Sequence, residues 1–396
     1  MSQRVFPPDL LTQSPAARLA YFTACTIAHP RLQEADQALR EAISAPTGAL
    51  LVFFYGPTGV GKTTVLQRRQ QQMTDEQRAA LEGDPGWMPI VRMEAIAPER
   101  GDFNWRDYYI DALRAFDEPL ISQKISNPEP AVAPPAPAQY IPRRIDSRSV
   151  LRVALESAIQ QRRPRAFFVD EAQHLAKLSS GRKLLDQLDC IKSLAMRTQT
   201  VHVLAGTYAL LILRQLSGQL SRRTRQIHFP RYRADVAADV RDFQNVLWNF
   251  QIRMPLPSEP DLLRHWAFCY ERSLGCIGLL KEWLTRALAT GLAQRTPQVT
   301  RSHLEQHALS VADCQTMATE MLEGEAMLEE GAGTRQRLQT MLALDSRHAT
   351  GGGPAVPAES SSPPTPPRQR PTMVGVRTPK RDPVGLAPCL PEERTP

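Results

Sequence analysis

The sequence predicts an α/β fold in which a parallel sheet is flanked by helices and followed by a smaller helical lid and a disordered tail. Up to about residue 232, apolar runs of strand length alternate with helical segments, which is the order of a parallel sheet. Beyond that point the strand signals stop, and helical patterns continue to residue 328. The last fifty residues are rich in proline and cannot build a core.

These signals divide the chain into four regions. Residues 1–46 are predicted to be an N-terminal helical extension, in which Ser14 caps a first helix that begins at Pro15. Residues 47–232 form the α/β core, 233–344 the helical lid, and 345–396 a disordered tail with twelve prolines. Within the core we expect strands in 49–55, 88–95, 165–175 and 200–206, and an exposed Pro-rich insertion at 127–142.

Composition limits the class of protein. The chain has 396 residues, 42% of them hydrophobic, and a formal net charge of +7, a modest excess compatible with a nucleic-acid partner. Its six cysteines form no C-x-x-C pair, so neither a zinc site nor a disulfide framework is predicted. No signal peptide or membrane-spanning run is recognisable, so we expect a cytoplasmic protein without membrane contact.

The stretch "GPTGVGKT" at 56–63 satisfies the pattern G-x-x-x-x-G-K-[ST] in full. Glycines let backbone N–H groups converge on phosphate oxygens, and the following helix adds its positive end. Lys62 would reach the β- and γ-phosphates of a nucleotide, and the hydroxyl of Thr63 would bind Mg²⁺. A Gly-rich turn without a ligand is the alternative, which the buried strand before it disfavours. The predicted nucleotide loop consists of Gly56, Pro57, Thr58, Gly59, Val60, Gly61, Lys62, Thr63 and Thr64.

Two further strand ends carry polar residues. In "AFFVDEAQHL", Asp170 suits the Mg²⁺ shell, and Glu171 is the candidate for activating the attacking water. Together with the loop, this pair predicts an ATPase that hydrolyses ATP with water; a solvated acidic strand end is the plainer alternative. In "VHVLAGTYAL", Thr207 follows a strand, where its side chain would touch the γ-phosphate or the water, unless it is an ordinary turn.

Two basic elements come later in the chain. Arg222, Arg223 and Arg225 cluster near the start of a predicted strand, where one guanidinium presented to a neighbouring subunit would stabilise transition-state charge. A solvated basic face or a DNA contact is the alternative. Lys281 lies on a helix opened by glycines and would reach the nucleotide from the lid, or else be an exposed helical lysine.

Together these elements resemble the AAA+ P-loop NTPases and, more specifically, the TnsC/TniB-like regulators of bacterial transposition. The distinctive wording is in "FFVDEAQHL", "LSRRTRQIHFPRY" and "GCIGLLKEWL", and the resemblance covers roughly residues 15–290. It implies ATP and Mg²⁺ as cofactors and assigns Thr207 and Lys281 to the two sensor positions. Many AAA+ proteins have arginine at the second of these positions. The resemblance also places the trans-acting arginine near 222–225.

The resemblance further implies partners. Such proteins oligomerise on double-stranded DNA as rings or helical filaments, recruit a DDE-type transposase, respond to a TniQ-type target selector, and disassemble on ATP hydrolysis. The sequence leaves open whether a CRISPR-associated guide-RNA complex or a DNA-binding protein selects the target. DNA contacts are expected mostly to the backbone, with Arg100 and Arg106 as candidates or, equally, as surface charges. We hypothesise that the basic tail docks a partner.

Three other functions share the motifs. A helicase loader or replication-initiator-type ATPase has the same core, although no C-terminal helix-turn-helix candidate is recognisable here. A secretion ATPase carries a similar Asp-Glu-Ala-Gln motif but usually a membrane segment as well. A nucleotide-switched scaffold would bind ATP and barely hydrolyse it.

Overall fold

The computed structural model describes residues 4–46, 48–97, 103–122, 147–175, 182–212, 224–329, 332–342 and 344. The predicted insertion at 127–142 and the predicted tail at 345–396 therefore lie outside the described residues. Contacts group residues 1–330 into one compact unit, and helix α16 (Ala332–Met341) belongs to a second one. None of the described helices is long and apolar enough to cross a membrane.

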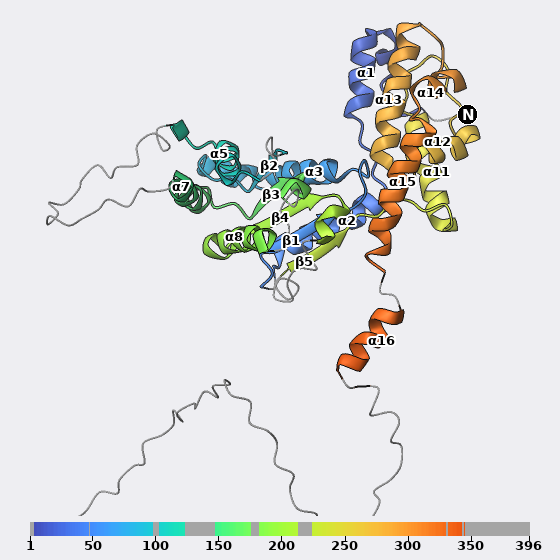
Figure 1. Ribbon diagram of the computed structural model, residues 1–396. Coiled ribbons are helices and arrows are strands. Elements are labelled where there is room, and N and C mark those ends of the chain that lie inside the picture. The colour runs from blue at the N-terminus through green and yellow to red at the C-terminus, as the bar shows by residue number, and fades with distance from the viewer. Residues whose placement is uncertain are drawn as a thin grey trace, which may run out of the picture. The chain divides into compact units, whose positions relative to one another are not determined.

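A five-stranded parallel sheet forms the centre of the first unit (Figure 1). Its order is β2-β3-β4-β1-β5, and every pair of neighbouring strands is parallel. All residues of β1, β3 and β4 are buried, as continuous apolar runs predict for strands covered on both faces. The strands are β1 (Leu51–Tyr55), β2 (Ile90–Glu94), β3 (Ala166–Asp170), β4 (Val201–Gly206) and β5 (Thr224–His228).

Alternate residues of the strands contribute to two hydrophobic cores, one on each face of the sheet. On one face, α5 (Trp105–Ala115), α7 (Ser147–Arg162) and α8 (Arg182–Thr198) cover Phe53, Phe167 and Leu204. On the other, α2 (Pro30–Ser44) and α3 (Lys62–Glu76) cover Phe54, Phe168 and Val203. The short helix α4 (Arg78–Gly83) follows α3. The predicted α/β fold with a flanked parallel sheet is confirmed.

The lid is helical as predicted and has a core of its own. Helices α11 (Ala237–Gln251), α12 (Trp266–Ser273), α13 (Ile277–Ala293) and α14 (Arg301–His307) build it, and α15 (Val311–Ala326) follows. The sequence predicts helices in 235–250 and 258–328, and the structure has no helix in residues 252–262, so the predicted gap is present and longer than expected. Two prolines at 255 and 257 account for the break because they cannot donate backbone hydrogen bonds.

The two N-terminal helices join different cores instead of forming one extension. Helix α1 (Pro15–Ala24) starts after Ser14, whose side chain accepts from the backbone N of Ala17, and it packs against α13 of the lid. Helix α2 packs on the sheet, where the buried Arg69 of α3 holds Asp36 in a largely buried ion pair. The Nε of Arg69 donates to Oδ1 of Asp36 at 3.0 Å. Removing one partner of such a pair typically costs about 3–5 kcal/mol.

One buried histidine makes the core sensitive to acid. His202 on β4 has no exposed surface, its Nδ1 donates to the carbonyl of Thr200 at 3.0 Å, and its Nε2 has no partner among the described residues. Burial lowers the pKa of His202 to about 4. Protonation would therefore place an unpaired charge in the core.

We predict that the contribution of His202 to the free energy of unfolding is constant above pH 6.5 and falls as the pH drops toward 4. A lowered folded-state pKa stabilises the neutral form, so His202 alone removes about 2 kcal/mol between pH 7 and pH 5. Urea melts of His202→Asn, whose amide still donates to Thr200, should show a shallower loss. His265→Asn on the lid is the control, and equal slopes for wild type and His202→Asn would contradict the prediction.

Candidate functional site

The register of the sheet brings three strand ends to one edge. Because β1 and β3 both pair with β4 in parallel, their carboxyl ends lie side by side with that of β4. The loop after β1, the acids after β3 and Thr207 after β4 therefore meet there. Carboxyl ends of parallel strands are where open α/β sheets bind ligands.

The loop at 56–63 has the conformation that its glycines predict. Gly59 and Gly61 have φ angles of 74° and 113°, which residues with a side chain rarely adopt. Gly56 is needed for space, since a Cβ there would lie 2.2 Å from the carbonyl oxygen of Phe229. Helix α3 begins at Lys62, so the backbone of Thr63 and Thr64 lies in its first turn, where N–H groups favour anions.

Lys62 is folded over this loop. Its Nζ donates to the carbonyls of Gly56 and Pro57 at 3.0 and 2.9 Å, and its side chain is buried. Burial lowers the pKa of Lys62 to about 8, against the opposing influence of Glu171. The ammonium is thus held at the loop by weak neutral acceptors, which a phosphate oxygen would replace with a charged one.

Thr63 and Asp170 are in direct contact. The Thr63 Oγ1 donates to Oδ2 of Asp170 at 2.8 Å, and Asp170 is buried. A hydroxyl and a carboxylate are the hard oxygen ligands that Mg²⁺ takes together with phosphates and waters, so the pair fits that ion. The Nη1 of Arg92 on β2 lies 3.8 Å from the same carboxylate oxygen. The sequence does not predict this residue at the site. Only the pairing of β2 with β3 places it there.

Glu171 and Thr207 lie at adjacent strand ends. Glu171 has a φ of 51°, a left-handed conformation unusual for a residue with a side chain, and its backbone N donates to Oδ1 of Asp170 at 3.0 Å. The Thr207 hydroxyl accepts from the backbone N of Ala209 at 3.4 Å, so it caps the short helix η3 (Tyr208–Leu210). Gln173 contacts both residues, a link that the stretch "FFVDEAQHL" does not by itself predict.

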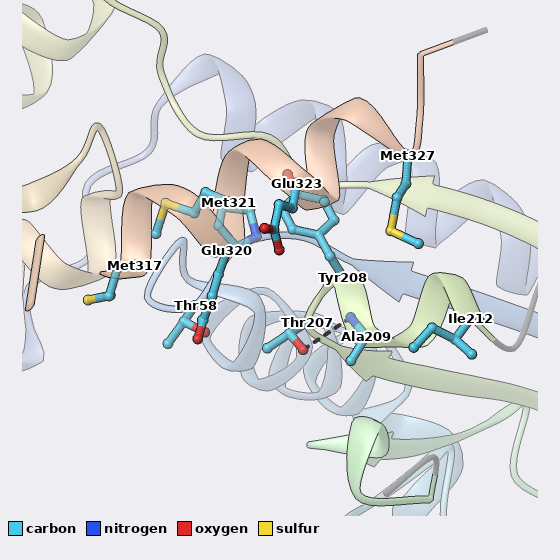
Figure 2. A pocket seen from close by; sticks show the side chains of 12 residues that line it. Thr58, Thr207, Tyr208, Ala209, Ile212, Met317, Glu320, Met321, Glu323 and Met327 are labelled. Atoms are coloured by element: carbon cyan, nitrogen blue, oxygen red, sulfur yellow. Dashed lines mark hydrogen bonds between the residues drawn. The ribbon is translucent and has the colours of Figure 1, made fainter. Parts of the chain in front are cut away.

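A cavity of about 520 Å³ adjoins this edge (Figure 2). Pro57 and Thr58 of the loop and Thr207 line one part of it, and α15 lines another. The residues that α15 contributes are Met317, Glu320, Met321, Glu323 and Gly324, and Met327 follows directly after the helix. Its size suits a small ligand.

Helix α13 of the lid is anchored at the nucleotide loop, and α15 is anchored at the segments that follow β4 and β5. The backbone N of Leu279 in α13 donates to the carbonyl of Gly59 at 3.0 Å, and a Cβ at Gly278 would lie 2.4 Å from that oxygen. On α15, Glu325 forms a two-point ion pair with Arg231 at 2.8 and 3.1 Å, and Gly324 rests on the ring of Tyr208.

The structure places Lys281 away from the loop. Its Nζ donates to the carbonyl of Thr23 in α1 at 2.7 Å, and burial lowers its pKa. Gly278 and Leu279, three and two residues before Lys281 in α13, contact the loop. In this arrangement Lys281 links α13 to α1, and the predicted role as second sensor would require it to leave Thr23. The position of Lys281 around the axis of α13 decides what it contacts, and the sequence alone does not predict that position.

Only some of the predicted arginines lie within the residues that the structure describes. Arg222, Arg223 and Arg100 lie outside the described residues. Arg225 is on β5 opposite Val52, toward the amino end of the sheet, and its Nη2 pairs with Oε2 of Glu41 at 3.1 Å. It is thus remote from the loop of its own chain, which is compatible with a role toward another subunit and equally with a solvated basic face or a DNA contact. Arg106 is exposed at the start of α5, compatible with a surface contact.

The comparison with protein families agrees with this geometry. Residues 45–213 match the family model described as an AAA domain. The chain carries an AAA domain. A comparison with curated protein sequences found no significant match.

Three of the solved structures that match this chain have low sequence identity to it. The ORC2 protein of Aeropyrum pernix, in ADPNP-ADP complexes, is 16% identical with a TM-score of 0.46, covering 74% of this chain and 71% of that one. A Walker-type ATPase of Pyrococcus abyssi is 14% identical with a TM-score of 0.40 (81% and 77% covered). Drosophila ORC bound to DNA is 13% identical with a TM-score of 0.41 (87% and 88% covered). TM-scores below 0.5 assign this chain no substrate or partner.

The burial of Lys62 predicts proton uptake when a triphosphate binds. With a pKa of about 8 in the free protein, about half of the amines are neutral at pH 8, and an anionic ligand restores the charged form. Calorimetry at pH 8 in buffers of different ionisation enthalpy should report up to about half a proton taken up. Lys62→Arg is the control because its guanidinium stays charged. Identical heats of wild type in all buffers would contradict the prediction.

Proposed function

We propose that this protein is an ATPase of the AAA+ type whose nucleotide state controls its assembly on double-stranded DNA. The observation that carries the proposal is the convergence of the nucleotide loop, the Thr63–Asp170 pair, Glu171 and Thr207 at one edge of the sheet. These are the groups that the hydrolysis of a nucleoside triphosphate requires.

Each residue has a role in this proposal. The backbone of 56–63 and the ammonium of Lys62 hold the β- and γ-phosphates, and Thr63 and Asp170 hold Mg²⁺, which supplies charge neutralisation when bound. Glu171 orients the attacking water and accepts its proton, while Thr207 contacts the γ-phosphate. A trans-acting arginine from 222–225 of a neighbouring copy completes the site; Arg225 must release Glu41 to take part.

DNA binding and partners are the finer part of the proposal. The net charge of +7 and the exposed Arg106 support contacts with the DNA backbone, for which Arg100 is the second candidate. The TnsC/TniB-like wording of "FFVDEAQHL" and "GCIGLLKEWL" favours a regulator of transposition, with a DDE-type transposase and a TniQ-type selector as partners. The same site serves a helicase loader or a replication-initiator-type ATPase equally well, and this is the second candidate.

Imaging on DNA tests the proposal. Negative-stain images of the protein on duplex DNA should show rings or filaments with ATP or a non-hydrolysable analogue and none with ADP. Single particles in every condition would contradict assembly. Efficient assembly on single strands, or capture of a replicative helicase, would favour the second candidate over the regulator of transposition.

Two substitutions separate binding from hydrolysis. Glu171→Gln should keep ATP bound, lower hydrolysis at least about a hundredfold, and prolong the residence of the oligomer on DNA. Lys62→Ala should lose nucleotide binding and with it assembly. Residence times follow from dilution experiments on labelled DNA. A Glu171→Gln protein that leaves DNA faster than wild type would show that the role of Glu171 is misassigned.

A further inference from the structure

The side-chain amide of Gln173 lies between Glu171 and Thr207. Gln173 is in the short helix η2 (Ala172–Leu175) directly after β3. Its Nε2 donates to Oε2 of Glu171, and its Oε1 accepts from the backbone N of Thr207 at 3.2 Å. One amide therefore connects the carboxylate that follows β3 to the backbone that follows β4.

The amide has a single chemically sensible orientation. Flipping it would set its NH₂ against the N–H of Thr207 and its oxygen against the carboxylate of Glu171, so both contacts would become repulsive. The side chain is also confined, with 8% exposed, and a Cβ at Gly206 would lie 2.4 Å from its Oε1. The glycine at the end of β4 thus makes room for this amide.

Glu171 needs such a partner. Its backbone is held in the left-handed region with a φ of 51°, a conformation that surrounding contacts must maintain. Its backbone N is bound to Asp170, and its backbone O accepts from the N of His174 at 3.0 Å. These contacts fix the main chain, while the Gln173 amide fixes the direction of the carboxylate.

We propose that Gln173 is a positioning residue that holds the carboxylate of Glu171 in register with Thr207 and thereby sets the rate of hydrolysis, not the affinity for ATP. This inference rests on the ATPase function proposed above. The link also gives the γ-phosphate contact at Thr207 a direct mechanical connection to the group that activates water.

Two substitutions of Gln173 test the rate. Gln173→Glu keeps the shape and the acceptor for Thr207 but opposes a second carboxylate to Glu171, and Gln173→Met removes both hydrogen bonds. Because a hydrogen bond to a charged group is lost, kcat should fall about tenfold to a hundredfold. The Kd for a non-hydrolysable analogue should change less than about twofold. Unchanged kcat in both variants would overturn the proposal.

The lid offers a matched control. Gln251 is also buried, donates from Nε2 to Oε1 of Glu259 at 2.7 Å, and accepts from the backbone N of Leu262 at 2.8 Å. Gln251→Glu and Gln251→Met therefore repeat the same chemistry away from the site and should leave kcat unchanged. An equal loss of kcat in these variants would reduce the effect of Gln173 to general destabilisation.

Action through Glu171 has its own signature. In a Glu171→Gln background, adding Gln173→Met should change the residual single-turnover rate less than about twofold, because the group being positioned is already lost. Gly206→Ala, which displaces the amide without removing it, should lower kcat as Gln173→Met does. If the losses of rate caused by Glu171→Gln and by Gln173→Met multiply in the double variant, Gln173 does not act through Glu171.

Hydrogen exchange tests the link without hydrolysis. Amide exchange at Thr207 should accelerate in Gln173→Met and also in Glu171→Ala, which frees the amide, but not in Gln251→Met. Unchanged exchange at Thr207 would overturn the link even in a fully active enzyme. If the wild type has no ATPase activity but amide exchange at Thr207 still accelerates in Gln173→Met and Glu171→Ala, the proposed function is refuted and the link is supported.

Discussion

Parallel pairing of β1 and β3 with β4 is the constraint on which the site depends. The register aligns Tyr55 with Gly206 and Val169 with Leu204, so the phosphate loop, the acids and Thr207 start from the same edge. Each of these groups is held by a strand buried on both faces. A slip of one residue would move every side chain to the opposite face and force both close-packed cores to repack, which makes other registers costly. The core thus fixes the geometry of the chemistry at its edge.

The phosphate loop is also where the lid meets the sheet. The backbone N of Leu279 in α13 donates to the carbonyl of Gly59 in the loop, while α15 contacts Tyr208 after β4 through Gly324 and Arg231 after β5 through Glu325. A ligand that moves the loop must therefore move the contact with α13 as well. Such a shared element is how a small change at a nucleotide is converted into a larger rearrangement. In a protein that assembles with its own copies, this coupling would report the nucleotide to the neighbouring subunit.

Short-range contacts bring Gln173 into the site. Its amide provides a donor to Glu171 and an acceptor to the backbone N of Thr207, which is a local constraint on both. Arg92 is similar, since it approaches Asp170 only through strand pairing. Gln173 belongs to the stretch "FFVDEAQHL", but the stretch does not predict its contact with Thr207, and Arg92 belongs to no recognisable motif. Residues of this kind tune a site whose main parts the motif already names.

By itself, the sequence determined the α/β fold, the strands and the phosphate loop, because these depend on local signals. Glycines that need positive φ at 59 and 61, an apolar run before them and acids after a strand are all readable within a few residues. Tertiary structure alone decided which lid residue touches the loop, that α1 and α2 join separate cores, and that Gln173 bridges Glu171 to Thr207. Those outcomes depend on helical phase and on strand order, which are set by packing between segments far apart in the chain. Lys281 illustrates the limit, since it lies only two residues after Leu279, which contacts the loop, yet on a different side of α13, where it binds the carbonyl of Thr23.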